Sequence, residues 1–524
     1  MTVVWNAQRV SEGLSKIDSA RPGVLANIQR LLNQYHNEKN SARYYDILLG
    51  DWVERYLHLV YVATQDLASG APLRRVYAND AKTFQIKPSN DTAEFFAQHQ
   101  TLPQVMLDAI QVAQISGVDV IKVSNDEVVL KNSVSFGWRG RLSNAAFKLF
   151  SRSSSRVLFV KPFSGKVPTS WVSALFSWRK WATHDDLNIP YLVSTKVDGD
   201  WRGKNLVAVG SDAGLESLAN SLVTAFLPVC AVESFKSLRE LVSAARPKRF
   251  DHVYSAQALW THFSFKLLVA QWCEKGTKLH YHQHGGWYGL DELHVGENYE
   301  ARVADSYYTW GWTRDNANVR PLSPVMPQIQ NQAKTHDSLI CFDQPKHVYR
   351  LQYFPLPGTL QTMYNQTADF VRLRESKTPL KIRLFPGDYG SVQKDAIKNA
   401  RYESNFDNSE DIFTQYSTSR IVIHNYLGTS WLETIGNNIP TVCFYDVDAY
   451  RFRSDAKRLL EDLVDAGVLH LSGESAALHV NEIENDVGAW WQRDDVQAAR
   501  ENFAKQFANF STDWKLIWQK NFAN

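Results

Sequence analysis

Two series of short apolar runs, separated by segments with helical spacing, restrict the fold of this chain more than any other feature. The second series is the clearer, and its runs lie at 338–342, 381–385, 420–424 and 441–445. Each run is almost wholly apolar, as is typical of parallel strands buried on both faces. The first series has runs at 118–123, 157–160, 253–255, 279–284 and 307–310, with a helix expected over 256–274. Alternating strands and helices predict parallel α/β units.

The length of 524 residues exceeds what one hydrophobic core usually holds, so two domains are expected. Three prolines within 321–327 interrupt regular structure between the two series. We therefore predict an α/β fold with two Rossmann-like domains that face a cleft. The first covers 1–325 and starts with a helical layer, and the second covers 335–488. The tryptophan-rich stretch 489–524 is predicted to be a helix that packs back on the first domain.

Cysteine usage and apolar run lengths exclude several classes of protein. The four cysteines, Cys230, Cys273, Cys341 and Cys443, form no CxxC pair, which argues against structural zinc and against a disulfide framework. No window approaches 18 uninterrupted apolar residues, so we expect no membrane span. The first residues lead into no long apolar run, so a secretory signal is not expected either. These features predict a cytoplasmic protein.

A strand, a Gly-Thr-Ser turn, a helix and a second strand follow one another in the second series, as in a compact βαβ unit. Gly428 allows close approach of a ligand to the backbone. Thr429 and Ser430 begin the helix, and the free N–H groups of a helix start attract phosphate. Glu433 lies one turn further on and can reach a ribose hydroxyl pair, while Asn425 ends the first strand. The alternative is a capping box, in which Glu433 only completes the helix start.

A second strand end supports a nucleotide site in this half. Arg383 carries a fixed-charge fork that suits phosphate or carboxylate, and Pro386 turns the chain just after the strand. The alternative for Arg383 is a surface or interdomain salt bridge. The predicted donor-binding residues are Arg383, Pro386, Asn425, Gly428, Thr429, Ser430 and Glu433.

The most distinctive string is Lys-Leu-His-Tyr-His-Gln-His-Gly-Gly-Trp-Tyr-Gly at 278–289. Alternating histidines on a strand share one face and can converge on zinc or iron, but no carboxylate stands at obvious ligand spacing, so we expect no metal. We predict instead a catalytic residue, His284, at the strand tip. The substrate loop is predicted to comprise His282, Gln283, Gly285 and Gly286. For His280 and His282 the alternative is that they are structural histidines with satisfied hydrogen bonds.

Four motifs carry a resemblance to a known family, at 43–52, 283–289, 308–312 and 429–433. They resemble a bacterial family of transferases that occurs with genes for surface polysaccharide and nonulosonic acid synthesis. The family is similar to GT-B glycosyltransferases, and in layout to enzymes that use CMP-activated ulosonic acids such as Kdo or sialic acids. Those enzymes place a Pro-containing strand end and a Ser/Thr helix start around the CMP phosphate. Phe385 stands where a histidine before the proline is usual.

The resemblance implies a metal-independent glycosyltransferase that moves a sugar from a nucleotide donor, with CMP favoured, to a surface-glycan or lipid-linked acceptor. Such a transfer needs a base near the acceptor hydroxyl, or a carboxylate nucleophile in a covalent mechanism. Glu233 is the carboxylate predicted for this role, and a solvated or N-capping Glu is its alternative. A polyol-phosphate transferase, a sugar-nucleotide epimerase and a non-catalytic glycan-binding protein remain as alternative functions.

The stretch 128–184 contains basic and aromatic residues and no acidic residue. Basic amphipathic surfaces bind anionic lipid, so we hypothesise peripheral contact with the inner face of the plasma membrane or with a lipid-linked acceptor. The alternative is a solvated basic face with aromatic residues in the core. No nucleic acid partner is expected.

Overall fold

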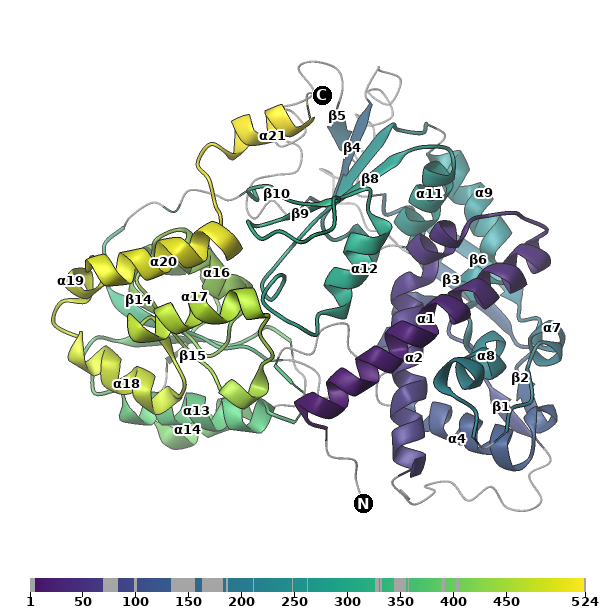
Figure 1. The fold of residues 1–524 in the computed structure, drawn as a ribbon, viewed down its shortest axis with the longest axis horizontal. Coiled ribbons are helices and arrows are strands. Elements are labelled where there is room, and N and C mark those ends of the chain that lie inside the picture. The colour runs from purple at the N-terminus through teal and green to yellow at the C-terminus, as the bar shows by residue number, and fades with distance from the viewer. Residues whose placement is uncertain are drawn as a thin grey trace.

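The computed structural model consists of two α/β halves side by side (Figure 1). The C-terminal half lies on the left of the view and the N-terminal half on the right. The described residues are 5–68, 83–98, 101–132, 156–162, 182–184, 187–210, 212–246, 248–261, 263–325, 329, 332–343, 355–356, 358–387, 392–401 and 405–522. Most of the basic stretch predicted to touch a membrane, 128–184, therefore lies outside the described residues.

The C-terminal half is built on a six-stranded sheet in which every pair of neighbouring strands is parallel. Its strands are β11 (His336–Ile340), β12 (Leu380–Arg383), β13 (Asn405–Phe406), β14 (Ser419–His424), β15 (Thr441–Phe444) and β16 (Leu469–His470). They lie in the order β13-β12-β11-β14-β15-β16. Counted along the chain this is 3-2-1-4-5-6, the order of dinucleotide-binding folds. The order reverses between β11 and β14, where such folds bind their ligands.

Helices cover both faces of this sheet (Figure 1). On one face lie α13 (Leu360–Leu373), α14 (Gln393–Ala400) and α18 (Gly473–Glu482), and α13 packs on both others. On the other face α20 (Asp494–Phe507) packs on α16 (Thr429–Gly436) and α17 (Ser454–Asp465). The remaining helices of this part are α15 (Ile412–Thr418) and α19 (Val487–Trp491). The strands are therefore enclosed between two helical layers, which explains why their sequences are almost wholly apolar.

The N-terminal half contains a second parallel sheet of six strands. Its order is β10-β9-β8-β7-β4-β5. The strands are β4 (Val157–Val160), β5 (Ala182–His184), β7 (His252–Ser255), β8 (Lys278–His282), β9 (Ser306–Thr309) and β10 (Val319–Pro321). The predicted GT-B-like class, an α/β fold with two Rossmann-like sheets, is confirmed.

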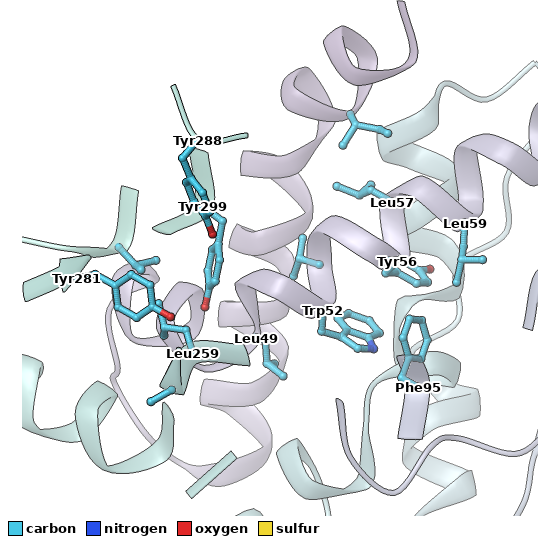
Figure 2. Packing of buried hydrophobic residues seen from close by; sticks show 14 of the residues in the cluster. Leu49, Trp52, Tyr56, Leu57, Leu59, Phe95, Leu259, Tyr281, Tyr288 and Tyr299 are labelled. Atoms are coloured by element: carbon cyan, nitrogen blue, oxygen red, sulfur yellow. The ribbon is translucent and has the colours of Figure 1, made fainter. Parts of the chain in front are cut away.

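A helical layer precedes this sheet, as expected for residues 1–60. Its two long helices are α1 (Ala7–His36) and α2 (Ala42–Ala68). Figure 2 shows Trp52, Tyr56 and Phe95 on one side of α2, and Tyr281, Tyr288 and Tyr299 on the other. The rings of Trp52 and Tyr56, one helical turn apart, stack at 4.8 Å. Because Tyr281 belongs to β8, α2 joins the helical layer to the sheet.

The same interface contains a buried ion pair. Lys266 Nζ donates to both carboxylate oxygens of Asp51 at 2.8 Å, and both side chains are almost fully buried. The other helices of this half are α3 (Thr92–Ala97), α4 (Leu102–Ile115), α7 (Gly199–Lys204), α8 (Leu215–Phe226), α9 (Phe235–Ala245), α10 (Ala258–Thr261), α11 (Phe263–Glu274) and α12 (Val295–Val303). Two small sheets complete it, one parallel between β1 (Phe84–Ile86) and β2 (Ile121–Val123), one antiparallel between β3 (Glu127–Asn132) and β6 (Tyr191–Lys196).

The chain ends in α21 (Trp514–Phe522), which packs on the N-terminal sheet. The Trp518 ring lies 5.0 Å from that of Tyr254 and 6.2 Å from that of Phe159. Its indole N–H donates to the carbonyl of Ser323 at 2.7 Å. The last helix therefore covers the face of the sheet opposite to α2.

Among the predicted runs, those at 118–123 and 279–284 are strands over only part of their length. The run at 118–123 begins with a 3-10 turn, Val118–Val120, and only Ile121–Val123 is a strand. The run at 279–284 ends as a strand at His282, because the chain then turns toward the glycine pair. His284 therefore lies beyond the strand. The alternating pattern predicted that it shares a strand face with His280 and His282, and this prediction is wrong.

Candidate interdomain active site

The carboxyl ends of β11 and β14 meet at the point where the C-terminal strand order reverses. Asn425, directly after β14, holds them together: its side-chain oxygen accepts from the Phe342 N–H at 2.9 Å. Its amide nitrogen donates to Thr367 Oγ1 of α13 at 3.0 Å. Asn425 is buried, and both ends of its side chain are engaged. Asn425 therefore ties the ends of β11 and β14 to α13.

The start of α16 follows at once. Gly428 is the N-cap residue, and a β-carbon there would lie 1.8 Å from the Tyr426 ring, so only glycine fits. The Ser430 hydroxyl turns inward and hydrogen-bonds with Tyr426 OH at 2.9 Å and His424 Nδ1 at 3.3 Å. Burial lowers the pKa of His424 to about 3, so this ring is neutral. Of the two predicted hydroxyls, only that of Thr429 faces outward to the other half.

Glu433 does not complete a capping box. No side chain caps the N-terminus of α16, and the Glu433 carboxylate accepts instead from the Tyr416 hydroxyl at 3.0 Å. The capping-box alternative for this stretch is therefore wrong. Glu433 is buried, and this burial raises its pKa to about 7.

The loop after β8 is held from behind by two of its predicted substrate residues. Gln283 is fully buried; its side-chain oxygen accepts from Trp310 N–H and from Trp312 Nε1, each at 2.9 Å. Its amide nitrogen donates to the Gly285 carbonyl at 2.8 Å. His282 is also buried, between the Tyr254 hydroxyl and the Leu322 carbonyl. Both side chains fix the loop and do not face the other half.

The glycine pair of this loop meets the start of α16, so the two predicted sites are in direct contact. Gly286 N–H donates to Thr429 Oγ1 at 2.8 Å. A β-carbon on Gly286 would lie 2.4 Å from the Gly428 carbonyl carbon and 2.5 Å from the Thr429 nitrogen. A β-carbon on Gly285 would meet only Thr429 Oγ1, at 2.8 Å. Backbone touches backbone here, between halves more than 140 residues apart in sequence.

Trp287 crosses from the same loop to the C-terminal half. Its ring lies 5.4 Å from that of Phe342, which stacks at 4.5 Å on Tyr426 and lies 5.9 Å from Phe385. These rings stand at the carboxyl ends of β11, β12 and β14. Trp287 has φ 73°, a left-handed conformation that is uncommon for a bulky residue and often marks a functional constraint. No sequence pattern indicated that these four aromatic residues would meet.

His284 is partly exposed and lies beside a buried tyrosine and glutamate. Its Nδ1 is 3.2 Å from Tyr288 OH and 3.7 Å from Glu300 Oε1. Burial lowers the pKa of His284 to about 4, and the Ala256 carbonyl opposes this shift.

Glu300 of α12 was not singled out by the sequence. It is fully buried and accepts from Trp260 Nε1 at 2.6 Å, Tyr288 OH at 2.9 Å and Tyr307 OH at 3.0 Å. Burial raises the pKa of Glu300 to about 8, against these three donors. The sequence does show that Glu300 lies in the helix that follows the glycine loop. The residues around it in the sequence do not indicate that it is buried.

Glu233 does not join the site. Both of its carboxylate oxygens accept from the buried Arg202 of α7, at 2.7 and 2.8 Å, and one also accepts from Asp198 N–H. Figure 1 shows α7 at the edge of the molecule farthest from the C-terminal sheet. The geometry of Glu233 is that of a structural ion pair rather than of a solvated or catalytic carboxylate.

Arg383 and Pro386 stand at the end of β12. Arg383 Nη1 donates to the Glu410 carbonyl at 2.8 Å and to Gln415 Oε1 at 3.2 Å, so part of its guanidinium is engaged within the C-terminal half. It forms no interdomain salt bridge among the described residues. Pro386 is exposed.

Just beyond the loop, the two halves are tied by backbone pairing. Asp291 and Phe452 form an antiparallel bridge, flanked by Glu292 N–H to the Arg451 carbonyl at 2.9 Å. The Arg453 side chain donates to the buried carboxylate of Glu297 at 2.8 Å.

Within the described ranges, no group of three or more His, Cys, Asp or Glu side chains is placed to hold a metal ion. None of the helices described is both long and apolar enough to cross a membrane.

Three solved structures illustrate the likeness of the chain to known folds. A TarM mutant from S. aureus, in complex with fondaparinux, α-GlcNAc-glycerol and UDP, is 14% identical with a TM-score of 0.35, over 54% of this chain and 58% of that one. MnaA from S. aureus with UDP is 9% identical with a TM-score of 0.37, over 70% of this chain and 96% of that one. MurG from Acinetobacter baumannii is 11% identical with a TM-score of 0.34, over 69% of this chain and 99% of that one.

No curated protein matches the sequence. A family model does, over residues 3–522, and its description is LIC12162 family transferase. The prediction of a transferase enzyme is thereby confirmed. Since the match spans nearly the whole sequence, the chain belongs to the LIC12162 family of transferases.

Proposed function

We propose that the protein is a glycosyltransferase that moves a sugar, with a CMP-activated ulosonic acid favoured, from a nucleotide donor to a surface-glycan or lipid-linked acceptor. The observation that carries the proposal is the contact between Gly286 and Thr429. It brings the carboxyl ends of strands from both Rossmann-like sheets to one place, and ligands of such sheets bind at these ends.

The phosphate is proposed to bind at the start of α16. The first N–H groups of a helix lack helical partners and favour an anion. The Gly286 N–H points at the same place, where its present acceptor is Thr429 Oγ1. A phosphate bound there replaces this hydroxyl as the acceptor of the Gly286 N–H. The Thr429 hydroxyl then donates to the phosphate, so that the donors come from both halves. Donors fixed in this way stabilise the charge that develops on the leaving phosphate without a metal ion.

The aromatic cluster of Trp287, Phe342, Phe385 and Tyr426 supports a base-binding role for the adjacent surface. Phe385 is 36% exposed and is therefore the ring that a nucleobase can reach first. Aromatic faces stack on bases with little regard to their identity. Arg383 and Pro386, at the end of the same strand, are proposed to border this surface.

His284 is the proposed base for the acceptor hydroxyl, since it is a partly exposed imidazole next to the glycine pair. The acceptor is proposed to enter from the N-terminal half, assigned to residues 1–325, and the donor from the half assigned to 335–488. The protein is also proposed to be cytoplasmic and to contact the inner face of the plasma membrane through 128–184. This location is consistent with a lipid-linked acceptor.

A thermal-shift screen with CMP, CDP, UDP and GDP tests the nucleotide site. A ligand that binds only the folded state raises the melting temperature, and at one ligand concentration the tighter ligand gives the larger shift. We expect the largest shift with CMP, and a smaller one in Thr429→Val, which keeps the side-chain shape but removes the hydroxyl. Thr418→Val is the matched control, because the Thr418 hydroxyl bonds only within its own helix end.

The outcomes separate the alternatives. A shift with UDP in place of CMP refutes the ulosonic acid donor and keeps the nucleotide site. No shift with any nucleotide, or equal shifts in Thr429→Val and wild type, refutes the site itself. Binding without release of nucleotide from any CMP- or UDP-sugar favours a non-catalytic glycan-binding protein.

A further inference from the structure

The tyrosine between His284 and Glu300 links the two side chains by hydrogen bonds. A phenol has one proton, and when Glu300 is ionised that of Tyr288 goes to Glu300 Oε1 at 2.9 Å. The Tyr288 oxygen is then the acceptor for His284 Nδ1, 3.2 Å away. In the tautomer that this arrangement requires, His284 carries its proton on Nδ1 and its lone pair on Nε2.

Glu300 has no contact with solvent and no cation among the hydrogen-bonding partners described for it. Its three donors, Trp260, Tyr288 and Tyr307, come from three different segments of the N-terminal half. A carboxylate without a cation is costly to bury, so its presence needs a reason beyond packing. Since a glutamine of the same shape would be cheaper to bury, the acid itself points to a use for its charge or its proton.

We propose that Glu300 is a positioning residue that acts through Tyr288 on His284, fixing the imidazole and receiving the proton that leaves the acceptor. The proposal rests on the glycosyl transfer proposed above. When the acceptor oxygen bonds to the anomeric carbon, the bond from that carbon to the phosphate oxygen breaks, and the phosphate leaves with the electron pair. The acceptor proton goes to His284 Nε2, the Nδ1 proton to the Tyr288 oxygen, and the Tyr288 proton to Glu300 Oε1.

The surroundings of Glu300 suit a carboxyl that exchanges a proton near neutral pH. Burial raises its pKa to about 8, whereas hydrogen bonds from Trp260, Tyr288 and Tyr307 act in the other direction. The titratable or charged groups near it are Glu297 on its own helix, Tyr281 of β8, Tyr307 of β9, and Tyr288 and His284 of the loop. One step further away stand Asp51 of α2, which faces Tyr281, and Arg314 and Arg453, which face Glu297.

Turnover of a nucleotide sugar by Glu300→Gln tests the proposal. We expect kcat to fall by about 10²-fold, the lower range for loss of acid–base assistance, with KM within a factor of about three. In wild type, kcat should rise with pH through about 8 as Glu300 ionises, and this rise should be absent in Glu300→Gln. Glu300→Asp, which restores a carboxylate, should recover part of kcat and the pH dependence.

Glu297→Gln is the matched control, because Glu297 is a buried glutamate of the same helix that pairs with Arg453 instead. It should lower the melting temperature and keep the rise of kcat with pH, displaced to lower pH because the Glu297 charge helps to raise the pKa of Glu300. Unchanged kcat and pH dependence in a folded Glu300→Gln protein overturn the proposal. So does an equal change of the pH profile in Glu297→Gln.

A second measurement needs no donor or acceptor and so separates this proposal from the proposed function. Diethyl pyrocarbonate modifies the unprotonated nitrogen of histidine, and mass spectrometry gives the rate for the His284 peptide. In wild type this rate should rise across about pH 8, and in Glu300→Gln the rise should be missing. Identical rate profiles overturn the coupling, whereas a coupled pair in a protein that turns over no donor overturns only the glycosyl transfer.

Discussion

Replacement of Gly286 by alanine tests whether the contact between the two halves is as close as the structure has it. The added β-carbon would lie 2.4 Å from the Gly428 carbonyl carbon, 2.5 Å from the Thr429 nitrogen and 2.8 Å from the Gly428 α-carbon. All three are backbone atoms, which no side-chain rotation can move. To reach an ordinary contact of 3.4 Å the loop must retreat by about 1 Å.

Such a retreat breaks the hydrogen bond from Gly286 N–H to Thr429 Oγ1, now 2.8 Å long. Overpacking costs about 1–3 kcal/mol, and a lost hydrogen bond about 1 kcal/mol. The total is roughly 2–4 kcal/mol. For 524 residues that melt together, with an unfolding entropy of about 2.1 cal/mol/K per residue, this corresponds to a fall in melting temperature of about 1 °C for each kcal/mol. The positive-φ penalty plays no part, because Gly286 is not among the left-handed glycines.

Differential scanning calorimetry measures this fall, and Gly285→Ala is the matched control. Its β-carbon would meet only the Thr429 hydroxyl, which can rotate away, so the cost should stay below about 1 kcal/mol. Nucleotide affinity should also fall in Gly286→Ala, since the displaced loop no longer offers its N–H group. Equal melting temperatures for Gly286→Ala and wild type would refute the close contact.

Three further predictions concern buried charges. Glu233→Gln leaves Arg202 without a counter-charge and should cost about 3–5 kcal/mol in calorimetry, with nucleotide affinity unchanged; a loss of turnover in a protein of wild-type stability would instead restore Glu233 as a catalytic candidate. Lys266→Met should cost a similar amount, and the double variant with Asp51→Leu should regain most of it; additive losses would contradict the pairing. Burial raises the folded-state pKa of Glu433 to about 7, above its unfolded value, so the neutral form stabilises the fold at low pH and this contribution is lost as pH rises from about 4.5 through 7. Melting temperatures of wild type and Glu433→Gln between pH 5 and 8 should show the steeper decline in wild type, and parallel curves would contradict the raised pKa.

Sequence periodicity predicted most of the parallel strands, because strands enclosed between helices consist of apolar residues and are bounded by polar turns. The run 157–160 and the strand Val157–Val160 coincide, and the four predicted runs of the C-terminal half each overlap a strand. The edge strands β13 and β16, of two residues each, were missed because so short a stretch has no periodicity. The 3-10 turn at Val118–Val120 was read as strand because its apolar spacing also fits an alternating pattern.

The site was predictable only where glycine or a helix start marks it. Gly286 and Thr429 stood out, and the structure brings them together. Side-chain direction was not predictable: Ser430 and Gln283 look like ligand-binding residues in sequence, but buried hydrogen-bonding partners turn both inward. Glu300 was missed for the converse reason, since an acidic residue in a helix suggests solvent exposure until three distant donors surround it.

The backbone bridge between Asp291 and Phe452 also limits how the molecule can move and melt. A second tie is the hydrogen bond from the Ser511 N–H, in the segment between α20 and α21, to the Ser323 hydroxyl at 2.9 Å. Two separated ties define a line, and rigid bodies joined along a line can rock about it but cannot slide apart. Opening of the loop from α16 should therefore be a rotation about this axis, and the two halves should lose their structure in one calorimetric transition.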